Sequence, residues 1–134
     1  MDGEVPEIRF VRPVPGFASL TRFALVRLGD AEDPTEEPVL FELRSLEDPE
    51  VAFVVARPSA YFSDYEFELD EVAAGDLGLK AADDALILVV LTVGADAAST
   101  TANLLAPVVV NVRTRSAAQV ILSGTDWPVR AAVV

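Results

Sequence analysis

The chain has 134 residues, of which 51% are hydrophobic, and a mean hydropathy of +0.36. This length favours one domain, and this hydrophobic content excludes intrinsic disorder. Cysteine and histidine are both absent, which excludes disulfides, thiolate metal sites, thiol catalysis and any mechanism that needs an imidazole. The net charge of −12 disfavours direct contact with nucleic acid; it either favours a basic protein partner or serves solubility alone.

The first half of the chain predicts four strands, because apolar residues alternate with polar ones or run together between turn-forming residues. These strands are expected at residues 8–12, 23–28, 39–46 and 51–56. Residues 1–7 are polar and are expected to fray. They lack an apolar signal core, so we expect a cytoplasmic protein, and no apolar run is long enough to cross a membrane. Residues 29–38 form an acidic loop without the regular spacing of a calcium loop, so a solvated charge run is expected.

Aromatic residues cluster after the fourth strand, at Tyr61, Phe62 and Tyr65. The segment that holds them is broken by serine and aspartate, as a loop is. Clustered aromatic rings on a loop form either a lid over the core or an exposed anchor for a partner. Phe17, after an early turn, presents the same choice between core packing and binding.

The residues that follow alternate as a short edge strand does. Two apolar residues alternate with Glu66, Glu68 and Asp70, which would form an acidic outer face. These carboxylates either keep an edge strand soluble or, with the aromatic residues before them, hold a partner. Asp70 would also cap a short helix over residues 71–77.

The most strongly apolar part of the chain spans residues 85–122. Its runs of Val, Ile and Leu predict buried strands at residues 86–93, 108–112 and 119–122. Asn103 is expected to bond nearby backbone groups, unless it contacts a partner, and Pro107 is expected at the start of a strand. Together these elements amount to about eight strands and one short helix, which predicts a mainly β, small antiparallel barrel or sandwich. We expect one such domain over residues 1–134.

The polar residues present no convincing active site. The glycines do not form a nucleotide-binding fingerprint. Asp83 and Asp84 lie in a predicted turn, where capping or solvation is the ordinary role of a carboxylate. We therefore expect a binding protein without metal or cofactor rather than an enzyme. The alternative is a small-molecule-binding or enzymatic β-barrel that uses buried carboxylates.

Several motifs resemble the flagellar assembly factor FliW family, in the order in which the family has them. They are Pro15-Gly16-Phe17, Leu46 with Pro49, Ala52-Phe53-Val54-Val55 with Pro58, Asp64-Tyr65, Leu91-Thr92-Val93, Thr101-Ala102-Asn103-Leu104-Leu105-Ala106-Pro107, Val110-Asn111 and Gln119-Val120-Ile121-Leu122. The Thr-Ala-Asn-Leu-x-Ala-Pro string is the most specific of them. The family often has a glycine in the turn before the last motif, where residues 116–118 stand here, and the stretch after Trp127 is short.

The resemblance implies a β-barrel-like, non-enzymatic regulator that binds flagellin in the cytoplasm. It also implies binding to CsrA, an RNA-binding repressor of flagellin translation, so that secretion of flagellin frees the protein to sequester CsrA. A repressor that holds RNA carries basic surface, which suits an acidic chain. The candidate partner-binding residues are Tyr61, Phe62, Tyr65, Glu66, Glu68 and Asp70, and the candidate structural residues are Pro15, Gly16, Phe17, Thr101, Asn103 and Pro107.

Overall fold

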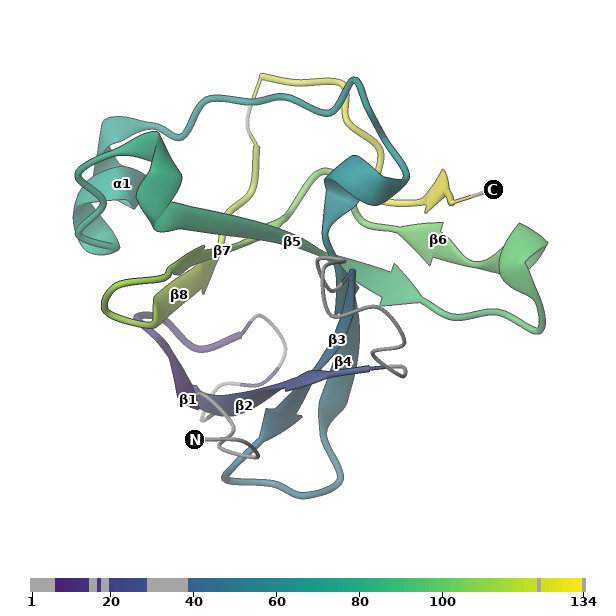
Figure 1. Ribbon diagram of the computed structural model, residues 1–134, viewed down its shortest axis with the longest axis horizontal. Coiled ribbons are helices and arrows are strands. Elements are labelled where there is room, and N and C mark those ends of the chain that lie inside the picture. Colours follow the sequence, from purple (N-terminus) through teal and green to yellow (C-terminus); the bar gives the residue numbers. More distant parts are fainter. Residues whose placement is uncertain (1–6, 15–16, 18–19, 29–38, 123, 134) are drawn as a thin grey trace, which may run out of the picture.

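Seven strands of the described chain close into a barrel (Figure 1). The computed structural model describes residues 7–14, 17, 20–28, 39–122 and 124–133. Neighbouring strands follow the order β4-β3-β2-β1-β8-β7-β5, and β5 pairs with β4 to close the ring. The barrel strands are β1 (Glu7–Phe10), β2 (Arg22–Arg27), β3 (Leu40–Ser45), β4 (Ala52–Ala56), β5 (Ala85–Thr92), β7 (Val108–Asn111) and β8 (Ser116–Gln119). The mainly β, single-barrel fold predicted from the sequence is confirmed.

The barrel encloses an apolar core, because alternate residues of its strands turn away from water. Phe23 of β2 is fully buried and contacts the ring of Phe10 edge-on, with centroids 5.3 Å apart. Burial of each such side chain contributes about 1.5–3 kcal/mol. One pair departs from the predicted antiparallel pattern, since β1 and β8 run parallel. These two strands are far apart in the sequence, so no hairpin imposes their relative direction.

β5 is the longest strand, and it organises the second half of the chain. Its first half pairs with β7, and its end pairs with β6 (Thr101–Ala102). β6 pairs in turn with β9 (Ala131–Ala132), so a short extension of the sheet projects from the barrel (Figure 1). Between β6 and β7, residues 103–107 bulge out of the ladder. Pro107 is buried at the end of this bulge, directly before β7.

The one α-helix of the described residues, α1 (Glu71–Asp76), packs beside the barrel strands β7 and β8. It begins where the sequence predicts, because the Asp70 side chain accepts a hydrogen bond from the Ala73 amide at 2.7 Å. Ala73 and the following Leu77 are buried in a second apolar cluster with residues of β7 and β8. Three short 3-10 turns, η1 (Pro58–Ala60), η2 (Ala82–Asp84) and η3 (Ala97–Ser99), complete the elements within the described ranges.

Two predicted strands are wrong. Residues 66–70 have no regular secondary structure and pair with no strand of the described chain. The last predicted strand lies earlier, at Ser116–Gln119, because the chain reverses at residues 112–115 rather than at 116–118. Arg115 adopts a φ of 65°, a left-handed conformation that favours glycine. The predictions for residues 1–6, for Pro15 and Gly16, and for residues 29–38 lie outside the described residues.

Asn111 produces the early turn. Its Oδ1 accepts hydrogen bonds from the amides of Arg113 and Thr114, at 2.9 and 3.3 Å. Its Nδ2 donates to the Leu77 carbonyl at 2.8 Å, and the side chain is only 2% exposed. One buried side chain therefore ends β7, shapes the turn and ties that turn to the end of α1. The helices of the described residues are too short and polar to span a bilayer.

Candidate functional site

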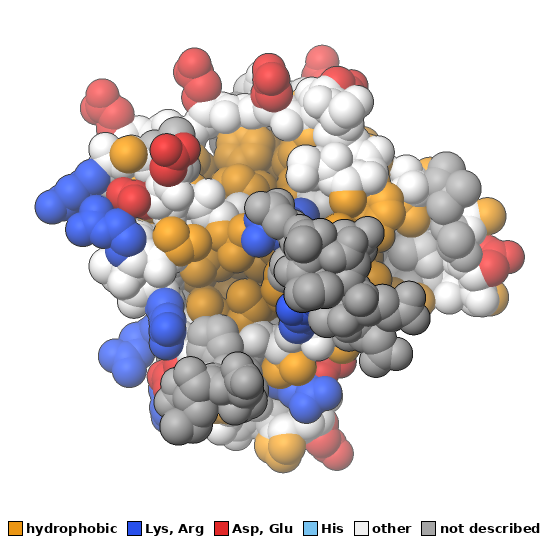
Figure 2. Space-filling view, in the orientation of Figure 1, with side chains coloured by type: hydrophobic (Ala, Val, Ile, Leu, Met, Phe, Trp, Pro, Cys, Tyr) orange, Lys and Arg blue, Asp and Glu red, His pale blue; other side chains and the backbone are white. Residues whose placement is uncertain are grey.

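A groove of about 1080 Å³ lies between β5 and residues 65–70, which we call the strap. The strap forms one wall, and the other walls come from residues 57–59, residues 79–81 and the first half of β5. Figure 2 shows hydrophobic side chains at the bottom of a hollow on this face, below a row of acidic side chains. An apolar floor with a charged rim is the usual make-up of a binding surface.

The strap is fixed at both ends. The Tyr65 hydroxyl donates a hydrogen bond to the Leu104 carbonyl at 2.6 Å, and its ring meets that of Trp127 edge-on at 4.8 Å. Trp127 Nε1 donates to the Glu66 carbonyl at 3.2 Å, and Asp70 caps α1 at the other end. Burial raises the pKa of Tyr65 to about 12, so this hydroxyl remains a donor at neutral pH.

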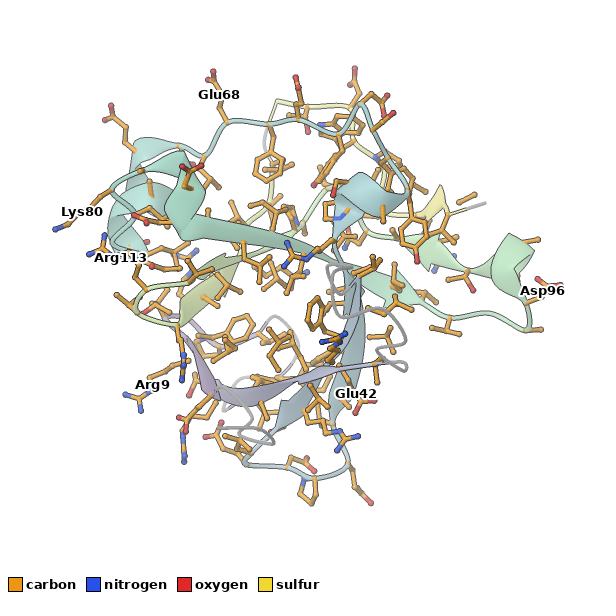
Figure 3. The ribbon with its side chains drawn as sticks, in the orientation of Figure 1. Arg9, Glu42, Glu68, Lys80, Asp96 and Arg113 are labelled. Carbon is orange, nitrogen blue, oxygen red and sulfur yellow. The ribbon has the colours of Figure 1, made fainter. Side chains whose placement is uncertain are left out.

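Between these anchors, exposure alternates along the strap. Glu66 and Glu68 are exposed, whereas Phe67 and Leu69 are half-buried and line the groove. Figure 3 shows Glu68 pointing outward from the strap and Lys80 at the α1 end of the structure. The ion pairs seen among the described residues involve neither Glu66 nor Glu68. The strap side of the rim therefore carries two carboxylates without an ion pair, while the cations Arg57 and Lys80 line other parts of the groove.

The structure separates the six candidate partner-binding residues into two groups. The groove is lined by three of them, Tyr65, Glu66 and Glu68. Tyr61 is 38% exposed outside the groove, while Phe62 packs against a third buried cluster with Leu104. The Asp70 side chain serves the helix as its cap.

The candidate structural residues that the structure describes make internal contacts. Phe17 packs edge-on against Phe53 of β4, with centroids 5.3 Å apart. Thr101 lies in β6, opposite Thr92 of β5. Asn103 accepts hydrogen bonds at Oδ1 from the Leu105 and Ala106 amides, at 3.1 Å each. The bulge is thus held by its own asparagine.

Sequence reasoning missed one wall of the groove and one buried side chain. The wall is the first half of β5, which has the pattern of an ordinary buried strand. Pro58 was the available signal, because a proline ends ladder pairing with a neighbouring strand. The side chain is that of Asn111, and an asparagine at the end of an apolar run was its signal.

Carboxylates with perturbed pKa values lie away from the groove. A hydrogen bond from Arg22 lowers the pKa of Glu7, and the amides of Arg22 and Thr21 lower the pKa of Glu47. Asp84, in the predicted turn, pairs with Arg113 at 3.3 Å. Within the described ranges no aspartate or glutamate is buried, and no three metal-ligating side chains cluster. The alternative reading, a barrel that works through buried carboxylates, finds no support there.

A second cavity, of about 200 Å³, lies inside the barrel. Its lining is apolar except for Gln119, whose side-chain amide donates to the Ala106 carbonyl at 3.0 Å. A small-molecule site needs several converging polar groups, and this cavity has one that is already bonded. The groove is therefore the better candidate for binding.

Comparison with known proteins places this geometry in one family. A model of the FliW protein family matches residues 2–133. Proteins named flagellar assembly factor FliW from Bacillus pumilus and Anoxybacillus flavithermus are 37% and 38% identical over 120 residues, which cover 90% of this chain and 79% and 78% of theirs. The relative from Clostridium kluyveri is 34% identical over 122 residues, covering 90% of this chain and 79% of its own.

A solved structure agrees with the sequence comparisons. The crystal structure of a flagellar assembly factor FliW superposes with a TM-score of 0.84 at 35% sequence identity. The match covers 95% of this chain and 84% of that one. The barrel, the strap and the β6–β9 extension are therefore compared over almost their whole length.

Proposed function

Since this chain belongs to the FliW family of flagellar assembly factors, we propose that it is a non-enzymatic regulator that binds flagellin in the cytoplasm. By partner switching it also sequesters the translational repressor CsrA. When flagellin is secreted, the freed protein takes up CsrA, and translation of flagellin resumes. The observation that carries this proposal is the family match over residues 2–133, together with relatives named as assembly factors.

The charge of the molecule supports such partners. The net charge of −12 attracts a basic protein, and a repressor that grips RNA phosphates carries basic surface. Glu66 and Glu68 stand exposed beside an apolar groove. Rim charges of this kind steer the encounter, while apolar and aromatic groups supply most of the affinity. The groove is thus our candidate surface for a protein partner.

A competition measurement with purified proteins tests the function. Immobilised CsrA should capture this protein, and added flagellin should displace it, because partner switching requires that the two exclude each other. Binding of neither protein would contradict the proposal. Simultaneous binding of both would contradict the switching part alone.

Charge reversal at the rim tests the site separately. Glu66→Lys combined with Glu68→Lys should slow association with either partner at low salt and lose that effect as salt rises. Glu50→Lys, at an exposed position in the turn between β3 and β4, is the charge-matched control for each of the two single variants, Glu66→Lys and Glu68→Lys. If the double variant associates at wild-type rates, the partner does not bind at the groove.

A further inference from the structure

The hydrogen-bonding direction of β5 can be read from two contacts. The Val112 amide donates to the Asp84 carbonyl at 2.8 Å, and the Asn103 amide donates to the Val90 carbonyl at 2.9 Å. Along an antiparallel strand, successive residues turn their backbone groups to opposite sides. The backbone amides and carbonyls of the even-numbered residues of β5 therefore point toward β7 and the bulge. Those of the odd-numbered residues point toward β4 and the groove.

On that second side the pairing of β5 stops early. Val89 lies opposite Ala56 of β4. Continuing this register brings Pro58 opposite Ile87, but proline has no amide hydrogen. The Pro58 carbonyl also has partners, since it accepts hydrogen bonds from the amides of Tyr61 and Phe62, directly after η1, at 3.0 and 2.8 Å. Within the described chain, the Ile87 amide and carbonyl therefore have no partner on this side.

The strap presents a second unpaired backbone across the groove. Residues 67–69 have no regular secondary structure, but their exposure alternates as that of a strand does. Among the described residues, their amides and carbonyls make no hydrogen bond. The sequence has the pattern of an edge strand here, yet the neighbour that such a strand needs is missing. The groove thus lies between β5 and a segment whose backbone, like that of Ile87, makes no hydrogen bond among the described residues.

We propose that the groove takes up an extended segment of a partner polypeptide as an additional strand on β5. The amides and carbonyls of Ala85 and Ile87 supply the ladder, at the spacing of about 7 Å that alternate strand residues have. A helical segment would not serve, because its backbone groups are already bonded and would leave these groups unpaired. The proposal rests on the proposed function only for the existence of a polypeptide partner.

The side chains of the groove define the chemistry of the added strand. Phe67, Leu69 and Leu86 line the groove and suit apolar side chains at every second position. Glu66 and Glu68, two residues apart and exposed, suit lysine or arginine at the positions between. The occupant is therefore a segment in which apolar and basic residues alternate.

A capped synthetic peptide in which valine and lysine alternate is the probe. We expect it to bind the wild-type protein and to slow hydrogen exchange of the Ile87 amide by at least about tenfold, as a new hydrogen bond does. Two further peptides are N-methylated at all valines or at all lysines. In an added strand, one of these two sets of amides faces β5, so at least one methylated peptide should bind at least about tenfold more weakly.

Matched protein variants test the charge. Glu68→Lys should weaken binding of the valine–lysine peptide, whereas Glu50→Lys, with the same change in net charge, should not. Absence of peptide binding, equal binding of all three peptides, or unchanged exchange at Ile87 in the complex would each overturn the proposal. These peptide measurements use neither flagellin nor CsrA. Failure of the proposed function would therefore appear in the competition measurement and not in them.

Discussion

The hydrogen-bond ladder of β5 is interrupted twice, by the bulge at residues 103–107 and by the groove beside its first half. The two interruptions differ in whether their backbone groups find other partners. In the bulge, four successive carbonyls each accept a hydrogen bond, from the Tyr65 hydroxyl, the Leu122 amide, the Gln119 side chain and the Val120 amide. In the groove, the Ile87 backbone and residues 67–69 find no such partners among the described residues. An interruption whose polar groups are bonded internally supports the fold, whereas one left open suits a partner.

The largest expected effect is at Asn111, which completes the turn after β7 as Asn103 completes the bulge. Asn111→Ala removes three hydrogen bonds from a buried position and leaves the Leu77 carbonyl unpaired. The free energy of unfolding should fall by about 3 kcal/mol, measured by denaturant titration. The control is Val112→Ala, at a side chain that is 51% exposed, which should change little. A loss at Asn111 no greater than this control would refute the role of the side chain.

At Asn103 we expect a smaller loss, because the bulge is partly exposed. Asn103→Ala should lower the free energy of unfolding by about 2 kcal/mol, since the Leu105 and Ala106 amides lose their acceptor. Asn103→Asp keeps an oxygen in the same place and should recover most of the loss. Unchanged stability together with lost partner binding would make Asn103 a contact residue and would break the comparison.

The strap anchor is next in size. Tyr65→Phe removes the hydroxyl that donates to the Leu104 carbonyl and should destabilise the protein by about 1 kcal/mol in thermal or denaturant unfolding. Tyr61→Phe, at the exposed tyrosine, is the matched control. Because the strap forms a wall of the groove, Tyr65→Phe should also weaken binding of the valine–lysine peptide. A peptide affinity equal to wild type would show that this anchor does not shape the groove.

The same hydroxyl predicts a loss of stability in alkali. Burial raises the pKa of Tyr65 to about 12 in the folded protein, above the usual value of about 10 in the unfolded chain. The folded state thus holds the proton more tightly, so this contribution is complete below pH 10 and is lost between about pH 10 and 12. Ultraviolet titration should show a late tyrosine ionisation that is absent in Tyr65→Phe. Its persistence in that variant would contradict the assignment.

The smallest expected effect on stability is at the rim. Glu66→Lys with Glu68→Lys changes two exposed side chains that pair with no described cation, so the free energy of unfolding should stay within about 0.5 kcal/mol of wild type. Binding should change while the melting temperature does not. A large loss of stability would mean that these carboxylates support the fold, and the contrast between the two regions would disappear.

Part of the site could be predicted from local patterns. The alternation of Glu66 and Glu68 with apolar residues correctly indicated alternating exposure with an acidic outer side, and Asp70 correctly indicated the start of α1. The strand pairing expected there is wrong, because period-two alternation reports exposure on two faces and carries no information about a neighbour. The anchors Leu104 and Trp127 hold the strap in place without a ladder.

By itself, the sequence determined six of the barrel strands, their apolar faces, the helix cap and the family, because each depends on neighbouring side chains or on a continuous motif. Only the tertiary structure decided which edge of β5 stays open. That edge stays unpaired because the register between β4 and β5 brings Pro58 opposite Ile87. This register joins segments about thirty residues apart in the sequence. The turn at Asn111 was likewise decided in three dimensions, since its amide reaches a carbonyl at the end of α1. Long-range register and burial select among local options that the chain leaves equally open.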